Sequence, residues 1–233
     1  NETAFDLVKI YLEYNSLRRK KLILEAFTEN IGLIAEHAMV TLTEVVLGLI
    51  IGILLGISTA LHLEMSPSAR LFLRPILIFS QAIPVFALAP LLTLWLGYGM
   101  ISKVTMAVLI IYFPVTSALH DGLVNTPAGY LHLSSVMGAS KLKTLFLIKF
   151  PAAMPSLLSG IRLSAVYAPI GATIGEWVGS SSGLGYLMLH ANARGQTDLM
   201  FAALVVLCAE ALIIWSVSNR ISLRFDRKYI ASM

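Results

Sequence analysis

Long stretches without Asp, Glu, Lys or Arg limit most strongly how this chain can fold. They occupy residues 45–63, 75–102 and 104–119, and the first extends toward Ala38 with only Glu44 interrupting it. A helix needs about 20 mostly apolar residues to cross a bilayer. Only helices and closed barrels satisfy their backbone hydrogen bonds there. We therefore expect an all-α membrane protein.

Two later stretches complete the predicted set of spans. Residues 157–178 carry Arg162 near the start and Glu176 near the end, and residues 199–219 contain Glu210. The chain is 57% hydrophobic and 13% charged, whereas soluble domains are about 45–50% apolar and about 25% charged. The prediction is a polytopic helical bundle with five spans in the lipid bilayer.

The basic residues predict the orientation of these spans. The connections at 62–74 and 120–155 and the tail after residue 219 share one side, whereas the opposite loops hold only Lys103 and Arg194. The shared side holds Arg70, Arg74, Lys141, Lys143, Lys149, Arg220, Arg224, Arg227 and Lys228. Because Lys and Arg gather on the cytoplasmic side, we assign this side to the cytoplasm. The net charge of +4 then reflects topology, and no nucleic-acid partner is expected.

The N-terminal residues disagree with this topology, since they fall outside yet include the basic run 18–21. Either another span precedes Asn1, which we favour, or Leu22 to Met39 forms an amphipathic helix along the membrane surface. The predicted organisation is an outer or interfacial segment over residues 1–37, a transmembrane domain over 38–219 and a cytoplasmic basic tail over 220–233.

A row of small residues marks the first span. Gly48, Gly52 and Gly56 recur at every fourth position, so one helix face is nearly bare backbone. Another helix can approach such a face closely. The alternative is incidental spacing, because glycine is common in membrane helices. We predict tight helix packing at this row.

An amphipathic insert lies between Thr126 and Pro151. Thr126 can cap a helix that starts at Pro127, Gly138 permits a bend, and Ser140 can cap a second short helix that Pro151 ends. Such a flat helix–bend–helix unit can present apolar side chains to a groove on a partner, while its lysines meet an acidic rim. Alternatively, the insert rests on anionic lipid headgroups.

The insert resembles the cytoplasmic "EAA" loop of importer-type ABC transporter permeases. That pattern is Glu-Ala-Ala, three residues, Gly, nine residues, Ile, any residue, Leu-Pro. Gly138, Ile148 and Pro151 fit it without a gap, with Phe150 in place of Leu, whereas His132-Leu-Ser134 replaces Glu-Ala-Ala. The resemblance implies that the following residues couple the chain to an ATPase: His132, Ser134, Ser135, Gly138, Ala139, Ser140, Lys141, Ile148 and Pro151.

The resemblance covers nearly the whole chain and is closest to permeases of the nitrate, sulfonate and taurine group. Five segments look like the subset assigned to pyrimidine precursors of thiamine or to riboflavin: Gln81–Pro90, Trp95–Gly99, Glu176–Gly179, Gly183–Met188 and Gln196–Ala203. Sulfonate, taurine or nitrate are the alternative substrates. The family implies a type I ABC importer permease fold that usually has six spans, and Asp6 to Tyr11 resembles the exit from the first.

The resemblance also implies partners at the bacterial inner membrane. Two copies of the permease would dock on two ATP-binding cassette subunits, and an external substrate-binding protein would deliver cargo. The sequence has no Gly-x-x-x-x-Gly-Lys-Ser/Thr phosphate loop, so ATP and Mg²⁺ are assigned to the partner. We expect no enzyme activity, cofactor or metal site in this chain. A secondary transporter or channel subunit not driven by ATP is the alternative.

Polar or helix-breaking groups within the spans are candidates for the translocation path. They are Gln81, Pro84, Tyr167, Pro169, Thr173 and Glu176. Pro84 and Pro169 are expected to break their helices and free carbonyl groups, although a kink satisfied by neighbouring helices is the alternative. Glu176 abuts Trp177 at the outer end, where it is either a gate or receptor contact or a snorkelling acid.

Overall fold

A computed structural model describes residue 18 and residues 20–230, with side chains described as far as Phe225. The part described is helical and contains no strand. Residues 20–29 are helical, and the later elements are α2 (Ile31–Met65), α3 (Pro67–Ala82), α4 (Val85–Leu96), α5 (Met100–Val124), α6 (Ala128–Val136), α7 (Lys141–Thr144), the π-helical η1 (Leu145–Lys149), α8 (Phe150–Gly179), α9 (Leu184–Ala193) and α10 (Thr197–Ile230). The all-α prediction is confirmed. The expected span exit at Asp6 to Tyr11 lies outside the described residues.

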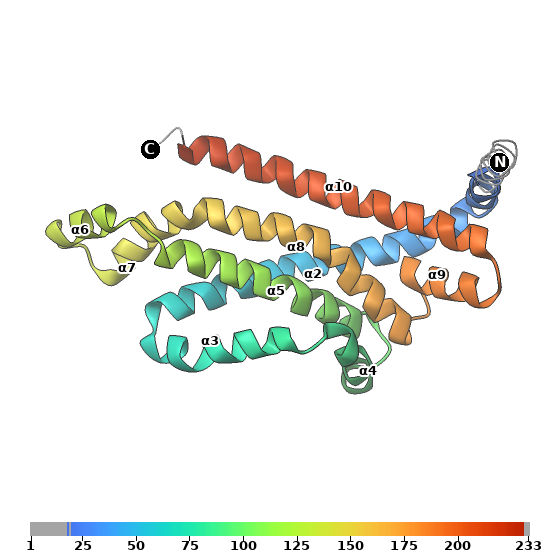
Figure 1. The fold of residues 1–233 in the computed structure, drawn as a ribbon, viewed down its shortest axis with the longest axis horizontal. Coiled ribbons are helices and arrows are strands. Elements are labelled where there is room, and N and C mark those ends of the chain that lie inside the picture. Colours follow the sequence, from blue (N-terminus) through green and yellow to red (C-terminus); the bar gives the residue numbers. More distant parts are fainter. Residues whose placement is uncertain (1–17, 19, 231–233) are drawn as a thin grey trace, which may run out of the picture.

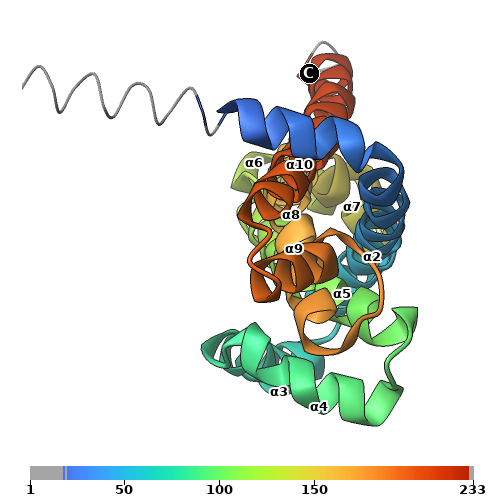
Figure 2. The same cartoon turned by 90° about the vertical axis from the view of Figure 1, so that its right-hand side faces the viewer.

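The long helices α2, α5, α8 and α10 run along the length of the molecule (Figure 1). The end that holds α6 and α7 also holds the α2–α3 turn and the C-terminus of α10, whereas α9 lies at the opposite end (Figure 1). Figure 2 shows α3 and α4 to one side of this bundle. The connections predicted to share one side of the membrane therefore gather at one end.

Five membrane crossings are compatible with the helix lengths. Four helical stretches of the described chain are long and apolar enough to cross a bilayer, and the α3–α4 pair makes a fifth if it counts as one span. This pair is bent by 102°. The break falls at Pro84, as predicted, because the residue before a proline is pushed out of the helical region, and Ile83 is extended with ψ 120°.

Two helices extend beyond the predicted spans, and one predicted helix break is absent. Helix α2 begins at Ile31, before the predicted span near Ala38, and α10 continues past Asn219 to Ile230. A stretch without charged residues indicates the part of a helix that can lie in the hydrocarbon core. The helix itself can be longer, because it continues until its terminal backbone groups find other hydrogen-bond partners. Pro169 does not break α8, which runs unbroken to Gly179. A single lost backbone bond is tolerated there because close packing on α5 holds both sides of the proline.

The core lies where α5 is held between α2 and α8. On the α2 side, a Cβ added to Gly48 would lie 2.6 Å from Ala107 Cβ, and one added to Gly52 would lie 2.7 Å from Ile111 Cγ2. Gly56 is equally close to Val115. The glycine row thus faces α5 and leaves no room for a methyl group.

Helix α8 approaches α5 from the other side in the same way. A Cβ on Gly160 would lie 2.7 Å from Ala118 Cβ, and one on Gly171 would lie 2.8 Å from Ala107 Cα. Ser164 Oγ donates a hydrogen bond to the Ile111 carbonyl at 3.2 Å. Because small residues let the backbones meet, the three helices form one packed unit.

Candidate functional site

The segment between α6 and α7 turns at Gly138, whose φ of +65° favours glycine. Two backbone bonds close this turn. The Gly138 amide donates to the Ser135 carbonyl at 3.0 Å, and the Ala139 amide donates to the Ser134 carbonyl at 3.0 Å. This pair of bonds is a Schellman motif, which ends a helix and fixes the direction of the next segment. The predicted helix–bend–helix is present.

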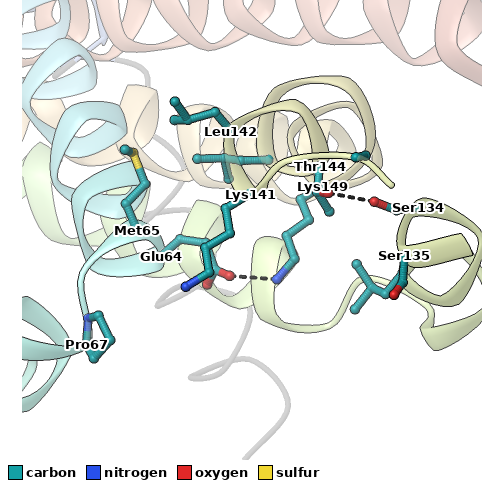
Figure 3. Close-up of a pocket in the computed structure, with 12 residues that line it drawn as sticks. Glu64, Met65, Pro67, Ser134, Ser135, Lys141, Leu142, Thr144 and Lys149 are labelled. Atoms are coloured by element: carbon teal, nitrogen blue, oxygen red, sulfur yellow. Dashed lines mark hydrogen bonds and ion pairs between the residues drawn. The ribbon is translucent and has the colours of Figure 1, made fainter. Parts of the chain in front are cut away.

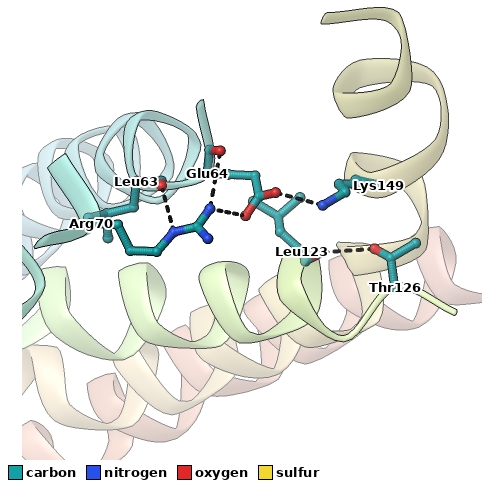
Figure 4. A network of polar contacts seen from close by, with 6 residues as sticks. All are labelled: Leu63, Glu64, Arg70, Leu123, Thr126 and Lys149. Atoms are coloured by element: carbon teal, nitrogen blue, oxygen red, sulfur yellow. Dashed lines mark hydrogen bonds and ion pairs between the residues drawn. The ribbon is translucent and has the colours of Figure 1, made fainter. Parts of the chain in front are cut away.

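The two predicted caps have different outcomes. Ser140 Oγ accepts a bond from the Lys143 amide at 3.4 Å, so it caps α7 as predicted. The predicted cap at Thr126 is wrong, because α6 has no side-chain cap. Thr126 Oγ1 instead donates to the Leu123 carbonyl at 3.0 Å (Figure 4). It satisfies a carbonyl at the end of α5, where helices leave acceptors without partners.

Pro151 does not end a helix, contrary to the prediction. α7, η1 and α8 follow one another without a gap, and Pro151 occupies the first turn of α8. A proline inside a helix lacks an amide and clashes with the carbonyl four residues earlier. The wider π-helical turn just before Pro151 relieves that clash. The helix–bend–helix therefore leads directly into a membrane span.

The side chains that this segment exposes at the surface of the molecule are mostly apolar. Val136 and Met137 are 86% and 75% exposed, and Leu133, Leu142, Phe146 and Leu147 are exposed as well. We call these six residues the docking face. His132, Ser135, Ser140, Lys141 and Lys143 are exposed around it, whereas Ile148 and Pro151 are half-buried. Exposed apolar patches with a polar rim mark binding surfaces for proteins or membranes.

A pocket of about 610 Å³ lies between this segment and the α2–α3 turn (Figure 3). Glu64, Met65 and Pro67 line it from one side, and Ser135, Ala139 and Lys141 belong to the other. Ser134, which is buried, shares a hydrogen bond of 2.6 Å with Thr144 Oγ1 across the Gly138 turn. This bond ties α6 to α7 on one side of the pocket.

Glu64 at the end of α2 joins three elements. Its Oε1 is 2.6 Å from Lys149 Nζ in η1, and its Oε2 is 3.3 Å from Arg70 Nη2 in α3 (Figure 4). Arg70 Nε also donates to the Leu63 carbonyl at 3.4 Å. Sequence reasoning did not single out Glu64. The sequence feature that could have pointed to it is that Glu64 is the one acidic residue in the connection at 62–74, which also holds Arg70 and Arg74.

The predicted path residues fall into two groups. Gln81, Pro84 and Tyr167 are exposed on the chain. Pro169, Thr173 and Glu176 are buried within it, and Thr173 Oγ1 donates to the Pro169 carbonyl at 2.7 Å. The six residues therefore do not share one surface.

Several buried polar residues at the α9 end were not predicted as site residues. Thr41 and Glu44 of α2 and Lys103 of α5 are at most 3% exposed. Thr41 donates a hydrogen bond to Glu176 of α8, as described below, and Glu176 is 1% exposed, so it is not a snorkelling acid. No sequence pattern within one helix brings them together. Among the described residues, no group of three His, Cys, Asp or Glu is placed to hold a metal ion.

Comparisons with known proteins give consistent matches. Residues 52–230 match the family model described as "Binding-protein-dependent transport system inner membrane component". A "Probable ABC transporter permease protein" of Haemophilus influenzae is 56% identical over 78% of this chain and 75% of its own length. The formylaminopyrimidine transport permease protein ThiX of Halalkalibacterium halodurans is 37% identical over 73% of this chain and 68% of its own length.

Solved structures match the fold over most of the chain. A chain from the inward-facing MetNI methionine ABC transporter has a TM-score of 0.74 at 19% identity, covering 84% of this chain and 98% of its own. A chain from an amino acid ABC transporter has a TM-score of 0.68 at 15% identity, covering 87% and 96%. The fold is that of type I ABC importer permeases.

Proposed function

Since the chain belongs to the family of binding-protein-dependent transport system inner membrane components, we propose that two copies of it form the path of an ABC importer for a small organic nutrient. Hydrolysis of ATP takes place in separate ATPase subunits. The observation that carries this proposal is the exposed docking face on a helix–bend–helix that continues into a span.

The docking face is proposed to insert into a groove on the ATPase subunit. Its six apolar side chains are exposed on a turn that Gly138 and the Ser134–Thr144 bond hold in shape. Apolar anchors on a fixed helical unit suit groove binding, and Lys141 and Lys143 suit an acidic rim. His132 replaces the acid of the family pattern, so any contact made there differs from a carboxylate contact.

Movement of the docking face is proposed to reach the spans by two routes. One is α8 itself, because α7 and η1 continue into it. The other is the Lys149–Glu64–Arg70 link, which connects η1 to α2 and α3. Coupling over a distance needs a contiguous element with two arrangements, and these residues supply a continuous set of contacts.

The α3–α4 break supports a second copy of the chain beside it. Ile83 and Phe86 are 47% and 65% exposed, and Pro84 between them is exposed too. Irregular backbone at membrane depth is tolerated only where protein or a water-filled cavity covers it. We propose that a second permease covers this break and that Gln81, Pro84 and Tyr167 line the path between the copies. Pro169, Thr173 and Glu176 support the path from within each chain.

Charge and the names of relatives support a proposed orientation and a proposed cargo. The end with the docking face holds Arg70, Lys141 and Lys149, which supports a cytoplasmic location for it and for the C-terminus. ThiX is named for formylaminopyrimidine and RibX of Chloroflexus aurantiacus for riboflavin. We propose a thiamine pyrimidine precursor or riboflavin as cargo. Relatives named for aliphatic sulfonates and taurine mark the other candidates.

Reconstitution tests this function. The permease is purified with the ATPase subunits and external binding protein of its own gene neighbourhood and placed in proteoliposomes. Formylaminopyrimidine, riboflavin and taurine are offered as labelled cargo, with and without ATP on the ATPase side. We expect uptake of one of them that needs ATP, the ATPase and the binding protein. Uptake that proceeds without the ATPase subunits would contradict the proposal.

A further inference from the structure

The start of α9 is held by side chains of other helices. The first backbone bond within α9 runs from the Leu187 amide to the Gly183 carbonyl at 3.0 Å. The earlier amides need other acceptors, as at any helix N-terminus. The Gly183 amide donates to His37 Nδ1 at 3.0 Å, and the Leu184 amide donates to Thr41 Oγ1 at 2.8 Å. Both acceptors belong to α2.

Glu176 of α8 supplies a further acceptor. Its Oε2 accepts a bond from the Gly185 amide, and its Oε1 accepts one from Thr41 Oγ1 at 2.6 Å. The Thr41 hydroxyl therefore accepts from α9 and donates to α8 at the same time. Glu176 is 1% exposed and Thr41 is fully buried. We call His37, Thr41 and Glu176 the α9 anchor.

Glycine makes this approach possible. Gly183 has a φ of +107°, and a Cβ there would overlap the Glu176 carboxyl group. A Cβ on Gly185 would lie 2.8 Å from Glu176 Oε2. The Gly-Leu-Gly sequence thus lets a carboxylate reach the backbone amides directly.

The preceding turn is held from its other side. Lys103 of α5 is 3% exposed, and its Nζ donates to the Gly179 carbonyl at the end of α8 at 3.3 Å. The same Nζ donates to the carbonyls of Tyr98 and Gly99 at 2.8 and 3.0 Å. Lys103 at the end of α8 and Glu176 at the start of α9 therefore hold the turn at residues 180–183 from both ends. Helix α9 lies at the end of the molecule opposite α6 and α7 (Figure 1).

We propose that Glu176 and Thr41 are positioning residues that hold α9 against α2 and α8 as the outer closure of the permease. This inference rests on the proposed transport function. While the anchor is intact, α9 moves with α2 and α8 as one body, so a movement that starts at the docking face also moves the outer end. When the anchor is weakened, α9 no longer follows. ATP hydrolysis then continues with less uptake.

The test compares two threonines of α2. Thr41→Val removes the bridging hydroxyl at nearly constant volume. Thr43→Val is the matched control, because Thr43 is exposed and bonds only to the Met39 carbonyl. Thr41→Ser keeps the hydroxyl and serves as the rescue. Each variant complex with its ATPase subunits is placed in lipid nanodiscs for hydrogen exchange and in proteoliposomes for cargo uptake per ATP hydrolysed.

We expect Thr41→Val to speed amide exchange over residues 183–187 by about tenfold or more, because a buried amide loses its acceptor. Uptake per ATP should fall severalfold while ATP hydrolysis persists. Thr43→Val and Thr41→Ser should match the unaltered protein. Glu176→Gln gives an independent check at the second residue, with the same direction expected.

Two results would overturn the inference: unchanged exchange over residues 183–187 in both Thr41→Val and Glu176→Gln, or faster exchange with unchanged uptake per ATP. Failure of the proposed function is recognised separately, since the unaltered complex would then show no ATP-dependent uptake. The exchange comparison between Thr41→Val and Thr43→Val still decides whether the anchor holds α9.

Discussion

Lys149 Nζ lies 2.6 Å from Glu64 Oε1, and this ion pair joins the segment behind the docking face to the end of α2. The two side chains are 19% and 11% exposed, so solvent screens the pair only partly. By contrast, the Lys21–Glu25 pair is 78% and 51% exposed with atoms 3.7 Å apart. The Lys149–Glu64 pair is therefore the one to test, and the exposed Lys21–Glu25 pair is its control in the same chain.

We predict that Glu64→Gln lowers uptake per ATP severalfold, because η1 loses its charged partner on α2. Hydrogen bonds to charged groups contribute about 1.5–3 kcal/mol, whereas exposed pairs contribute about 0–1 kcal/mol. Lys149→Gln combined with Glu64→Gln should cost less than the sum of the single variants. The measurement is a double-mutant cycle on uptake per ATP in proteoliposomes. An additive cycle, or an equal effect from Lys21→Gln, would exclude the link.

Gly138→Ala is predicted to weaken binding of the ATPase subunit. The residue has a φ of +65°, which costs a residue with a Cβ roughly 1–2 kcal/mol. No atom blocks the added methyl group, so the effect arises from the backbone alone. Gly138→Asn should restore much of the affinity, since asparagine tolerates this conformation. Affinity is measured by co-purification at graded ATPase concentrations.

Gly129→Ala is the control for this experiment. Gly129 lies in α6 of the same segment, has open space around it and does not have a positive φ. Its substitution should leave the affinity unchanged. Equal losses for Gly129→Ala and Gly138→Ala would show that the bend is not what the ATPase recognises.

Gly52→Ala is predicted to destabilise the bundle. The new Cβ would lie 2.7 Å from Ile111 Cγ2, so α2 and α5 must move apart. Overpacking of this kind costs typically about 1–3 kcal/mol. Gly32→Ala in the same helix meets no atom within 4 Å and should be neutral or slightly stabilising. Thermal unfolding in detergent gives the comparison, and equal melting temperatures would contradict close packing at the row.

Pro84→Ala is predicted to straighten the α3–α4 break and lower uptake. Without the proline ring, Ile83 regains access to the helical region, so α3 and α4 can merge. Pro90→Ala, inside α4, removes a proline where the helix is already continuous and should have little effect on the bend.

The bend is measured by the distance between spin labels on two exposed residues, Ile76→Cys in α3 and Leu94→Cys in α4. Cys208, the single cysteine, is replaced by serine for this purpose. Pro84→Ala should lengthen the distance relative to the parent, and Pro90→Ala should not. An unchanged distance with Pro84→Ala would mean that packing, rather than the proline, sets the bend.

Hydropathy predicted where the chain crosses the bilayer, and local turn chemistry predicted the bend at Gly138 and the cap at Ser140. The helix limits were less accurate, since Pro151 continues a helix after the π-helical turn. A proline does not by itself end a helix, since Pro90, Pro114 and Pro169 also lie inside helices, and the residue types alone did not reveal the π-helical turn before Pro151.

The buried polar groups were missed for a different reason. Thr41 and Glu176 are separated by 135 positions along the chain, and Glu64 and Lys149 by 85. Each residue has an unremarkable setting within its own helix. Their meeting depends on how α2, α5 and α8 pack, which the glycine rows indicated only as close approach between helices.

The π-helical turn at Leu145–Lys149 makes the number of residues between Gly138 and Pro151 important for the direction in which the docking face points. Such a turn holds one residue more than an α-helical turn, and one residue corresponds to a rotation of about 100° around the helix axis. Deleting any residue between Gly138 and Pro151 would therefore turn the docking face away from its partner while leaving its composition almost intact. The number of residues between Gly138 and Pro151 therefore constrains this segment in addition to the identity of its side chains.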